Sequence, residues 1–167
     1  GRSYIATTGY TGEDGFEWLV PASESANAWN TALAAGADEI DCVLPYQVLL
    51  SGQIEVVKEF LAAVRQATLG RCLKIIIESG ELVTCQQIGK ATELVVESGA
   101  DFVKTSTGFH KSGGASVHAV QLMRATVGNS IGVKASGGIR TRESALEMIK
   151  AGASRLGTSA TSAILAG

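Results

Sequence analysis

DFVKTSTGF, residues 101–109, and GVKASGGIRT, residues 132–141, are two short β-prone segments that each carry a lysine, Lys104 and Lys134. Each segment breaks at glycine and leads into residues that can begin a helix. About thirty residues separate the lysines, which is the length of one strand–helix–strand unit. The spacing therefore predicts that both lysines lie at the carboxyl ends of adjacent parallel strands, where such folds build their sites.

Two ammonium groups a few ångströms apart repel each other. The repulsion lowers the pKa of one lysine, which can then lose its proton near neutral pH and act as an amine nucleophile. This is the chemistry that a Schiff-base enzyme needs. The alternative is that both lysines extend from strand ends into solvent and have no chemical role.

Five strands are predicted from repeated helix exits. AGADEID (residues 35–41), SGADFVK (98–104) and AGASRLG (151–157) each place glycine at the end of a helix, followed by an apolar strand. The strands are expected at residues 38–44, 72–78, 101–106, 131–135 and 154–159, with Val, Ile and Leu in their interiors as in buried parallel sheets. Lys74, early in the second strand, is expected to face the same interior.

Helices are expected between these strands. Thr84 and Gln87 form a capping box for a helix to residue 96, Ser116 can cap residues 117–127, and Thr141 can cap residues 142–151. A further helix over residues 55–68 places five apolar side chains on one face, Val56, Val57, Phe60, Leu61 and Val64. Alternating strands and helices predict an α/β fold with a parallel sheet.

The first 35 residues have a different pattern. Two β-rich runs between residues 5 and 21 flank Gly, Glu and Asp, which predicts a hairpin. Ser23 can then cap a helix over residues 24–35. Trp18 and Trp29 are interpreted as packing residues.

Residues 36–167 resemble deoxyribose-phosphate aldolase, a class I aldolase on a (β/α)8 barrel. Besides the lysine segments, the resemblance rests on ADEIDCVLPY (residues 37–46), LKIIIESGEL (73–82) and RLGTS (155–159). It implies a fold made of part of a TIM barrel, with five of its eight strands, because the units resembling strands one to three are absent. A complete barrel usually needs about 250 residues.

The resemblance also implies roles for individual residues. Lys104 matches the family's Schiff-base lysine, Lys134 the lysine that lowers its pKa, and Asp41 the carboxylate that moves a proton with a water. The substrate phosphate is expected at two small-residue turns, Gly137, Gly138, Gly157, Thr158 and Ser159. Asp41 could instead only pair with lysines, Lys74 included, and glycine turns also occur without a phosphate. Ala160 stands where the family often has a second serine.

GYTGEDGFE, residues 9–17, is similar to the aminomethyltransferase of the glycine cleavage system. There Glu17 matches a position associated with folate, although a solvent-facing strand residue is the simpler interpretation. We therefore interpret the chain as a chimera of a hairpin–helix segment, residues 1–35, and a partial barrel, residues 36–167, joined as one folded unit. A natural fusion is the alternative. The absence of an initial Met is interpreted as a trimmed or engineered start.

Composition narrows the function classes. The chain has 167 residues, 46% hydrophobic and 18% charged, which is typical of a compact domain. A net charge of −2 argues against nucleic-acid binding, and no apolar run could span a membrane. Three scattered cysteines, Cys42, Cys72 and Cys85, have no metal-ligand spacing; they are expected to be buried, in a cytoplasmic protein. Neither a metal nor a cofactor is expected.

The leading functional hypothesis is an aldolase-derived protein whose activity is lost or vestigial. The alternative is an active aldolase that cleaves 2-deoxyribose 5-phosphate into acetaldehyde and glyceraldehyde 3-phosphate through an imine on Lys104. Because three barrel strands are absent, apolar surface and unpaired strand edges are expected to be covered in a two-fold homodimer.

Overall fold

The computed structural model describes residues 4–7, 16–19, 31 and 36–166. β1 (Tyr4–Thr7) and β2 (Phe16–Leu19) pair antiparallel, which confirms the predicted hairpin. They form a two-stranded sheet of their own and add no strand to the main sheet. The helix expected over residues 24–35 lies outside the described residues, except for Thr31. The side chains of Glu17, Trp18 and Trp29 also lie outside the described part of the chain.

The main sheet has five parallel strands in sequential order, as the sequence predicts. They are β3 (Glu39–Val43), β4 (Cys72–Ile76), β5 (Phe102–Lys104), β6 (Gly132–Ser136) and β7 (Arg155–Gly157). Each lies inside its predicted range or within one residue of it. The result is part of a barrel, with five strands in place of eight among the described residues.

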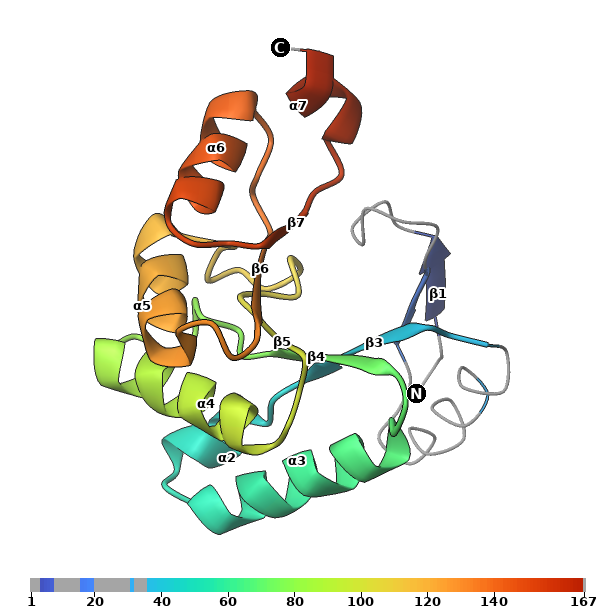
Figure 1. Ribbon diagram of the computed structural model, residues 1–167, viewed down its shortest axis with the longest axis vertical. Coiled ribbons are helices and arrows are strands. Elements are labelled where there is room, and N and C mark those ends of the chain that lie inside the picture. Colours follow the sequence, from blue (N-terminus) through green and yellow to red (C-terminus); the bar gives the residue numbers. More distant parts are fainter. Residues whose placement is uncertain (1–3, 8–15, 20–30, 32–35, 167) are drawn as a thin grey trace.

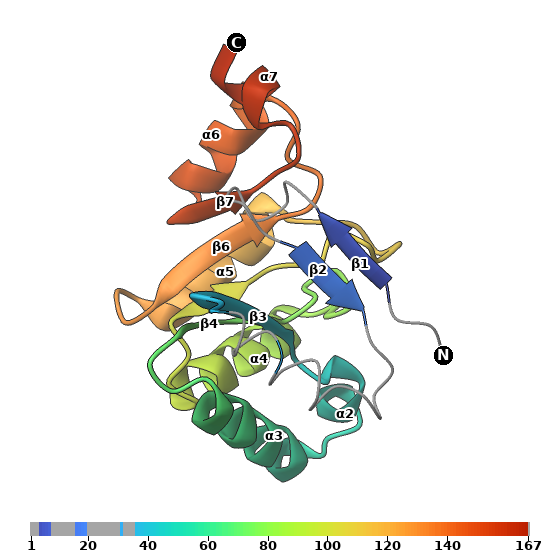
Figure 2. The same ribbon diagram turned by 90° about the vertical axis from the view of Figure 1, so that its right-hand side faces the viewer.

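Helices connect the strands and lie on one side of the sheet, with the β1–β2 hairpin on the other side (Figures 1 and 2). The long ones are α3 (Ile54–Ala67), α4 (Cys85–Glu97), α5 (Val117–Val127) and α6 (Arg142–Lys150). The predicted caps at Thr84, Ser116 and Thr141 are all present. Two short helices, α2 (Tyr46–Leu50) and α7 (Thr161–Ala166), were not predicted. In the described part of the chain no helix is long and apolar enough to cross a membrane.

The hydrophobic core lies between the sheet and these helices. Leu73, Ile75 and Ile77 of the β4 segment are completely buried there. On α3 the predicted apolar face of five residues is wider than the buried face of the structure, because Val56 and Phe60 are 48% and 37% exposed. Its buried stripe is the narrower set Val57, Leu61 and Val64, which follows the i, i+4, i+7 spacing.

The sheet is strongly curved. Five flat strands would hold β3 and β7 about 19 Å apart, at roughly 4.8 Å per strand. Nevertheless Arg155 of β7 donates a hydrogen bond of 2.6 Å to Glu39 of β3. The first and last strands therefore curl toward each other and enclose a concave face, as in a barrel wall. That face is lined largely by charged side chains, among them Lys74, which was expected to face it.

The prediction that all three cysteines are buried is confirmed only in part. Cys42 and Cys72 are half-buried, and Cys42 packs against the core on the face opposite Asp41. Cys85, at the start of α4, is exposed and hydrogen-bonds His118 at 3.3 Å. It is therefore not the buried residue that was expected.

Candidate active site

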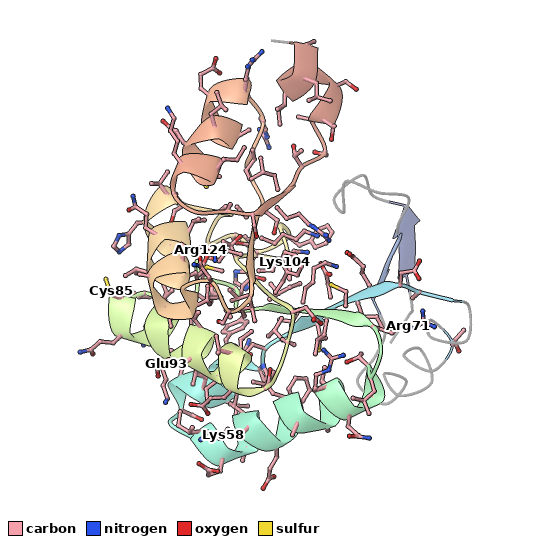
Figure 3. All side chains as sticks on the ribbon, viewed as in Figure 1. Lys58, Arg71, Cys85, Glu93, Lys104 and Arg124 are labelled. Atoms are coloured by element: carbon pink, nitrogen blue, oxygen red, sulfur yellow. The ribbon has the colours of Figure 1, made fainter. Side chains whose placement is uncertain are left out.

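Strand register sets the lysines beside one another. Lys104 of β5 pairs with Lys134 of β6, and Asp41 of β3 pairs with Lys74 of β4. Because alternate residues of a strand share a face, all four side chains enter the concave face. Figure 3 shows Lys104 among the strands, whereas Lys58 and Glu93 lie on outer helices. Lys104 and Lys134 are nearly completely enclosed, with 3% and 1% of their side chains exposed.

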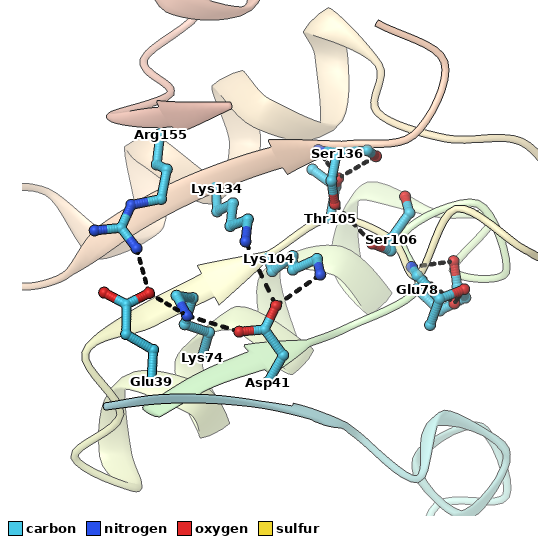
Figure 4. Close-up of polar contacts among 11 residues, drawn as sticks. Glu39, Asp41, Lys74, Glu78, Lys104, Thr105, Ser106, Lys134, Ser136 and Arg155 are labelled. Carbon is cyan, nitrogen blue, oxygen red and sulfur yellow. Dashed lines mark hydrogen bonds and ion pairs between the residues drawn. The ribbon is translucent and has the colours of Figure 1, made fainter. Parts of the chain in front are cut away.

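Asp41 is the centre of the cluster (Figure 4). Its Oδ1 accepts from Lys74 Nζ at 2.8 Å, and its Oδ2 accepts from Lys104 Nζ at 2.7 Å. Lys134 Nζ lies 3.5 Å from the same Oδ2. The Nζ atoms of Lys104 and Lys134 are therefore at most about 6 Å apart, close enough for each charge to disfavour the other.

The three lysines keep Asp41 ionised. Burial alone would raise the pKa of Asp41, but the charges of Lys104 and Lys134 and the hydrogen bonds from Lys104 and Lys74 outweigh it and lower the pKa to about 2. Asp41 is therefore a carboxylate at neutral pH.

The surroundings shift the pKa of Lys134 and the pKa of Lys74 in opposite directions. Burial, together with the charges of Lys104 and Lys74, lowers the pKa of Lys134 more than Asp41 raises it. Burial also disfavours the charge of Lys74, but hydrogen bonds and charges from Asp41 and Glu39 outweigh it and raise the pKa of Lys74. Lys134 therefore loses its proton more readily than an ordinary lysine, whereas Lys74 stays a cation at neutral pH.

Glu39 and Arg155 belong to the cluster although neither was predicted as a site residue. Glu39 accepts from Lys74 Nζ at 2.7 Å and from Arg155 Nη1 at 2.6 Å, and Arg155 lies over the ring of Phe102. The signal for Glu39 was its place two residues before Asp41, which puts both carboxylates on one face. Nothing local pointed to Arg155, because its contact depends on the curvature of the whole sheet.

The proposed phosphate turns lie side by side. Gly137 and Gly138 follow β6 with φ of +89° and +80°, a left-handed conformation that favours glycine. Thr158, which follows Gly157 at the end of β7, donates from Oγ1 to the carbonyl of Ile139 at 2.7 Å. Ser159 is exposed beside it. The structure thus brings the two glycine turns together beyond the carboxyl end of the lysine strands.

A buried carboxylate holds the loop after Lys104. Glu78 follows β4, is 2% exposed and has a φ of +50°, which is uncommon for a residue other than glycine. Its Oε2 accepts from Thr107 Oγ1 at 2.7 Å, and both carboxylate oxygens lie near the Thr107 amide. The loop that begins at Lys104 is therefore anchored to the neighbouring strand.

Within the described residues, no group of His, Cys, Asp and Glu side chains could hold a metal ion. The amines and carboxylates of the concave face instead suit covalent chemistry on a carbonyl compound, since a neutral amine needs only a nearby base and a charge partner.

Comparisons with known proteins point to one family. The DeoC/LacD family aldolases match residues 7–166, a range that includes residues 9–17, for which a likeness to aminomethyltransferase was predicted. The deoxyribose-phosphate aldolase of Mycobacterium avium is 52% identical over 142 residues, covering 81% of this chain. This chain spans 62% of that relative, which is less than two thirds of its length.

Solved structures agree with the sequence comparison. A chain described as QR15, an aldolase, has a TM-score of 0.79 at 38% identity, covering 87% of this chain and 65% of its own length. Deoxyribose phosphate aldolase from Aeropyrum pernix, described as uniquely tetrameric, has a TM-score of 0.74 at 32% identity, covering 89% of this chain and 62% of its own. The dimer and the cytoplasmic location stay predictions for this chain.

Proposed function

Because this chain belongs to the DeoC/LacD family of aldolases, we propose that it cleaves 2-deoxyribose 5-phosphate into acetaldehyde and glyceraldehyde 3-phosphate through an imine on Lys104. The observation that carries this proposal is the enclosed cluster in which Asp41 contacts both Lys104 and Lys134. The family relatives support the choice of substrate, since the M. avium protein is a deoxyribose-phosphate aldolase.

The lysine pair supplies the nucleophile. The charge of Lys134, at most about 6 Å away, is proposed to favour loss of a proton from Lys104 to water, and Asp41 offsets the charge that remains. Neutral Lys104 then attacks the aldehyde carbon C1 of the open-chain sugar, and loss of water leaves a protonated imine. The imine is the electron sink of the reaction, because its positive nitrogen can take up the electron pair of a breaking bond.

Cleavage follows from that electron sink. The C3 hydroxyl loses its proton, the C2–C3 bond breaks, and its electron pair moves into the imine to form an enamine. Glyceraldehyde 3-phosphate leaves with C3 as its new aldehyde carbon. Protonation of C2 and hydrolysis of the remaining imine then release acetaldehyde and free Lys104. Asp41, with a water, is the proposed carrier of these protons.

The phosphate is proposed to bind at the two adjacent glycine turns. The backbone amides of a left-handed Gly-Gly turn can point toward one anion, and the turn at Gly137 and Gly138 leads into α6. Gly157, Thr158 and Ser159 would complete the site from β7. No cofactor is part of this proposal.

The test is acetaldehyde release from 2-deoxyribose 5-phosphate. We expect release by the unaltered chain and none above background with Lys104→Ala. Lys58→Ala, which removes an exposed lysine of α3, serves as the matched control and should keep the full rate. Release by Lys104→Ala at the same rate as the unaltered chain would rule out the proposed imine.

The alternative is a chimera whose activity is lost or vestigial. The sheet of five strands favours it, because a wall of the barrel is missing from the described residues and a shift of about 1 Å in a catalytic group can cost roughly 10²-fold in rate. The family match from residue 7 onward weighs against a foreign first segment. A rate far below that of the M. avium relative, measured side by side, would favour the chimera.

A further inference from the structure

The hydroxyl of Ser106 is a buried polar group without a hydrogen-bonding partner. Ser106 is 0% exposed, and among the described residues nothing donates to or accepts from its Oγ. A buried hydroxyl without a partner costs free energy, so one that is kept calls for an explanation. Thr92 is equally buried and shows the ordinary case, because its hydroxyl donates to the carbonyl of Ile88 at 2.7 Å.

The backbone around Ser106 is held on both sides. Ser136 Oγ donates to the carbonyl of Ser106 at 2.7 Å. Thr105 Oγ1 donates to the carbonyl of Ser136 and accepts from its amide, both at 3.0 Å. Thr107 is bonded to Glu78. The hydroxyl of Ser106 therefore has no partner although the backbone around it is firmly positioned, which is the arrangement expected of a group that binds a ligand.

Ser106 lies between the reactive amine and the glycine turn. It follows Lys104 by two residues, so the alternation of an extended chain directs both side chains to the concave face. A Cβ on Gly137 would lie 3.7 Å from the Cβ of Ser106. Figure 4 shows Ser106 between Lys104 and the Glu78 contact. A sugar phosphate joined to Lys104, with its phosphate at Gly137, would therefore pass its middle carbons beside this hydroxyl.

We infer that Ser106 is a further substrate-binding residue, whose hydroxyl hydrogen-bonds a hydroxyl of the substrate between the imine carbon and the phosphate. The inference rests on the proposed function and extends it. In 2-deoxyribose 5-phosphate these hydroxyls are on C3 and C4, and a serine can both donate to and accept from either of them. Lys104 and Ser106 are both buried, at 3% and 0% exposed, so a substrate that reaches the amine enters the same enclosed region of the concave face.

The test compares two compounds on Ser106→Ala. Acetaldehyde carries no hydroxyl, and 2-deoxyribose 5-phosphate carries both. Each compound is titrated with borohydride present, and the reduced adduct on Lys104 is quantified by mass spectrometry. We expect the half-saturating concentration of the sugar phosphate to rise about tenfold, the loss of one hydrogen bond, and that of acetaldehyde to stay unchanged. Ser106→Cys, which keeps the volume, should behave in the same way.

Thermal stability provides the second readout. Because the Ser106 hydroxyl has no protein partner, Ser106→Ala should melt at the same temperature as the unaltered chain or higher, whereas Thr92→Val should melt lower. Any one of three results for Ser106→Ala would overturn this inference but leave the proposed function standing. They are an unchanged affinity for the sugar phosphate, an equal loss of affinity for both compounds, and a lower melting temperature. No adduct of either compound on the unaltered chain would overturn the proposed function, and this inference with it.

Discussion

Asp41→Asn should destabilise the chain by an amount that depends on pH. The pKa of Asp41 falls from 3.8 to about 2 in the folded chain, and its side chain is only 20% exposed. At about 1.4 kcal/mol per pKa unit, the ionised carboxylate stabilises the fold by about 2 kcal/mol at pH 7. The substitution removes this stabilisation and leaves three ammonium groups facing one another.

The sign of the pH dependence follows from the lowered pKa. A group whose pKa is lower in the folded state stabilises the fold above its unfolded pKa, and that stabilisation is lost as the pH falls through the folded pKa. The difference between Asp41→Asn and the unaltered chain should therefore be full at pH 7, shrink below the ordinary value of 3.8, and fall to roughly half near pH 3.

Urea unfolding, followed by circular dichroism between pH 7 and pH 3, measures this difference. Glu93→Gln is the matched control, because Glu93 is 53% exposed and pairs only loosely with Lys90. The control should change the free energy of unfolding by less than about 0.5 kcal/mol. Equal stability of Asp41→Asn and the unaltered chain at pH 7, or a difference that does not shrink at low pH, would refute the electrostatic account of the cluster.

Three further substitutions test neighbouring parts of the site. Lys134→Met replaces a buried amine with an apolar side chain of similar length, so the free energy of unfolding should stay the same or rise. Acetaldehyde release should fall by roughly 10²-fold. An unchanged rate would remove Lys134 from the mechanism. Thr107→Val deprives the buried Glu78 of a hydrogen bond and should lower the free energy of unfolding, measured in urea, by about 1–3 kcal/mol. Thr107→Ser keeps the hydroxyl and should lower it by less. Equal losses for the two variants would argue against that contact. Arg155→Met breaks the half-exposed contact with Glu39 and should cost about 1 kcal/mol at low salt. That loss should shrink in 1 M salt, and a loss independent of salt would point to packing on Phe102 instead.

Local patterns predicted most of the parallel sheet. Glycine at the helix ends, runs of Val, Ile and Leu, and caps at Thr84, Ser116 and Thr141 are local signals, and from residue 36 onward the structure contains each predicted strand and helix. The two short helices were missed because five or six residues contain too few turns for an apolar period to be recognised.

The site could be predicted only where neighbouring strands define it. Lys104 and Lys134 are register partners on adjacent strands, so their separation follows from the strand–helix–strand unit alone. The Glu39–Arg155 contact joins residues 116 positions apart through the curvature of five strands, which no local pattern encodes. Ser106 was overlooked for a related reason, because an unpartnered hydroxyl can be recognised only after all neighbouring side chains are placed.

Reductive trapping with peptide mapping shows which lysine of this chain, if any, forms an imine with the sugar phosphate. The unaltered chain is incubated with 2-deoxyribose 5-phosphate and borohydride, digested, and searched by mass spectrometry for the lysine that carries the reduced adduct. We predict the adduct on Lys104, none on Lys74, which Asp41 and Glu39 keep protonated, and none on Lys134, which is proposed to act only through its charge. An adduct on Lys134 in place of Lys104 would reverse the two roles, and no adduct on any of the three lysines would contradict Schiff-base chemistry in this chain.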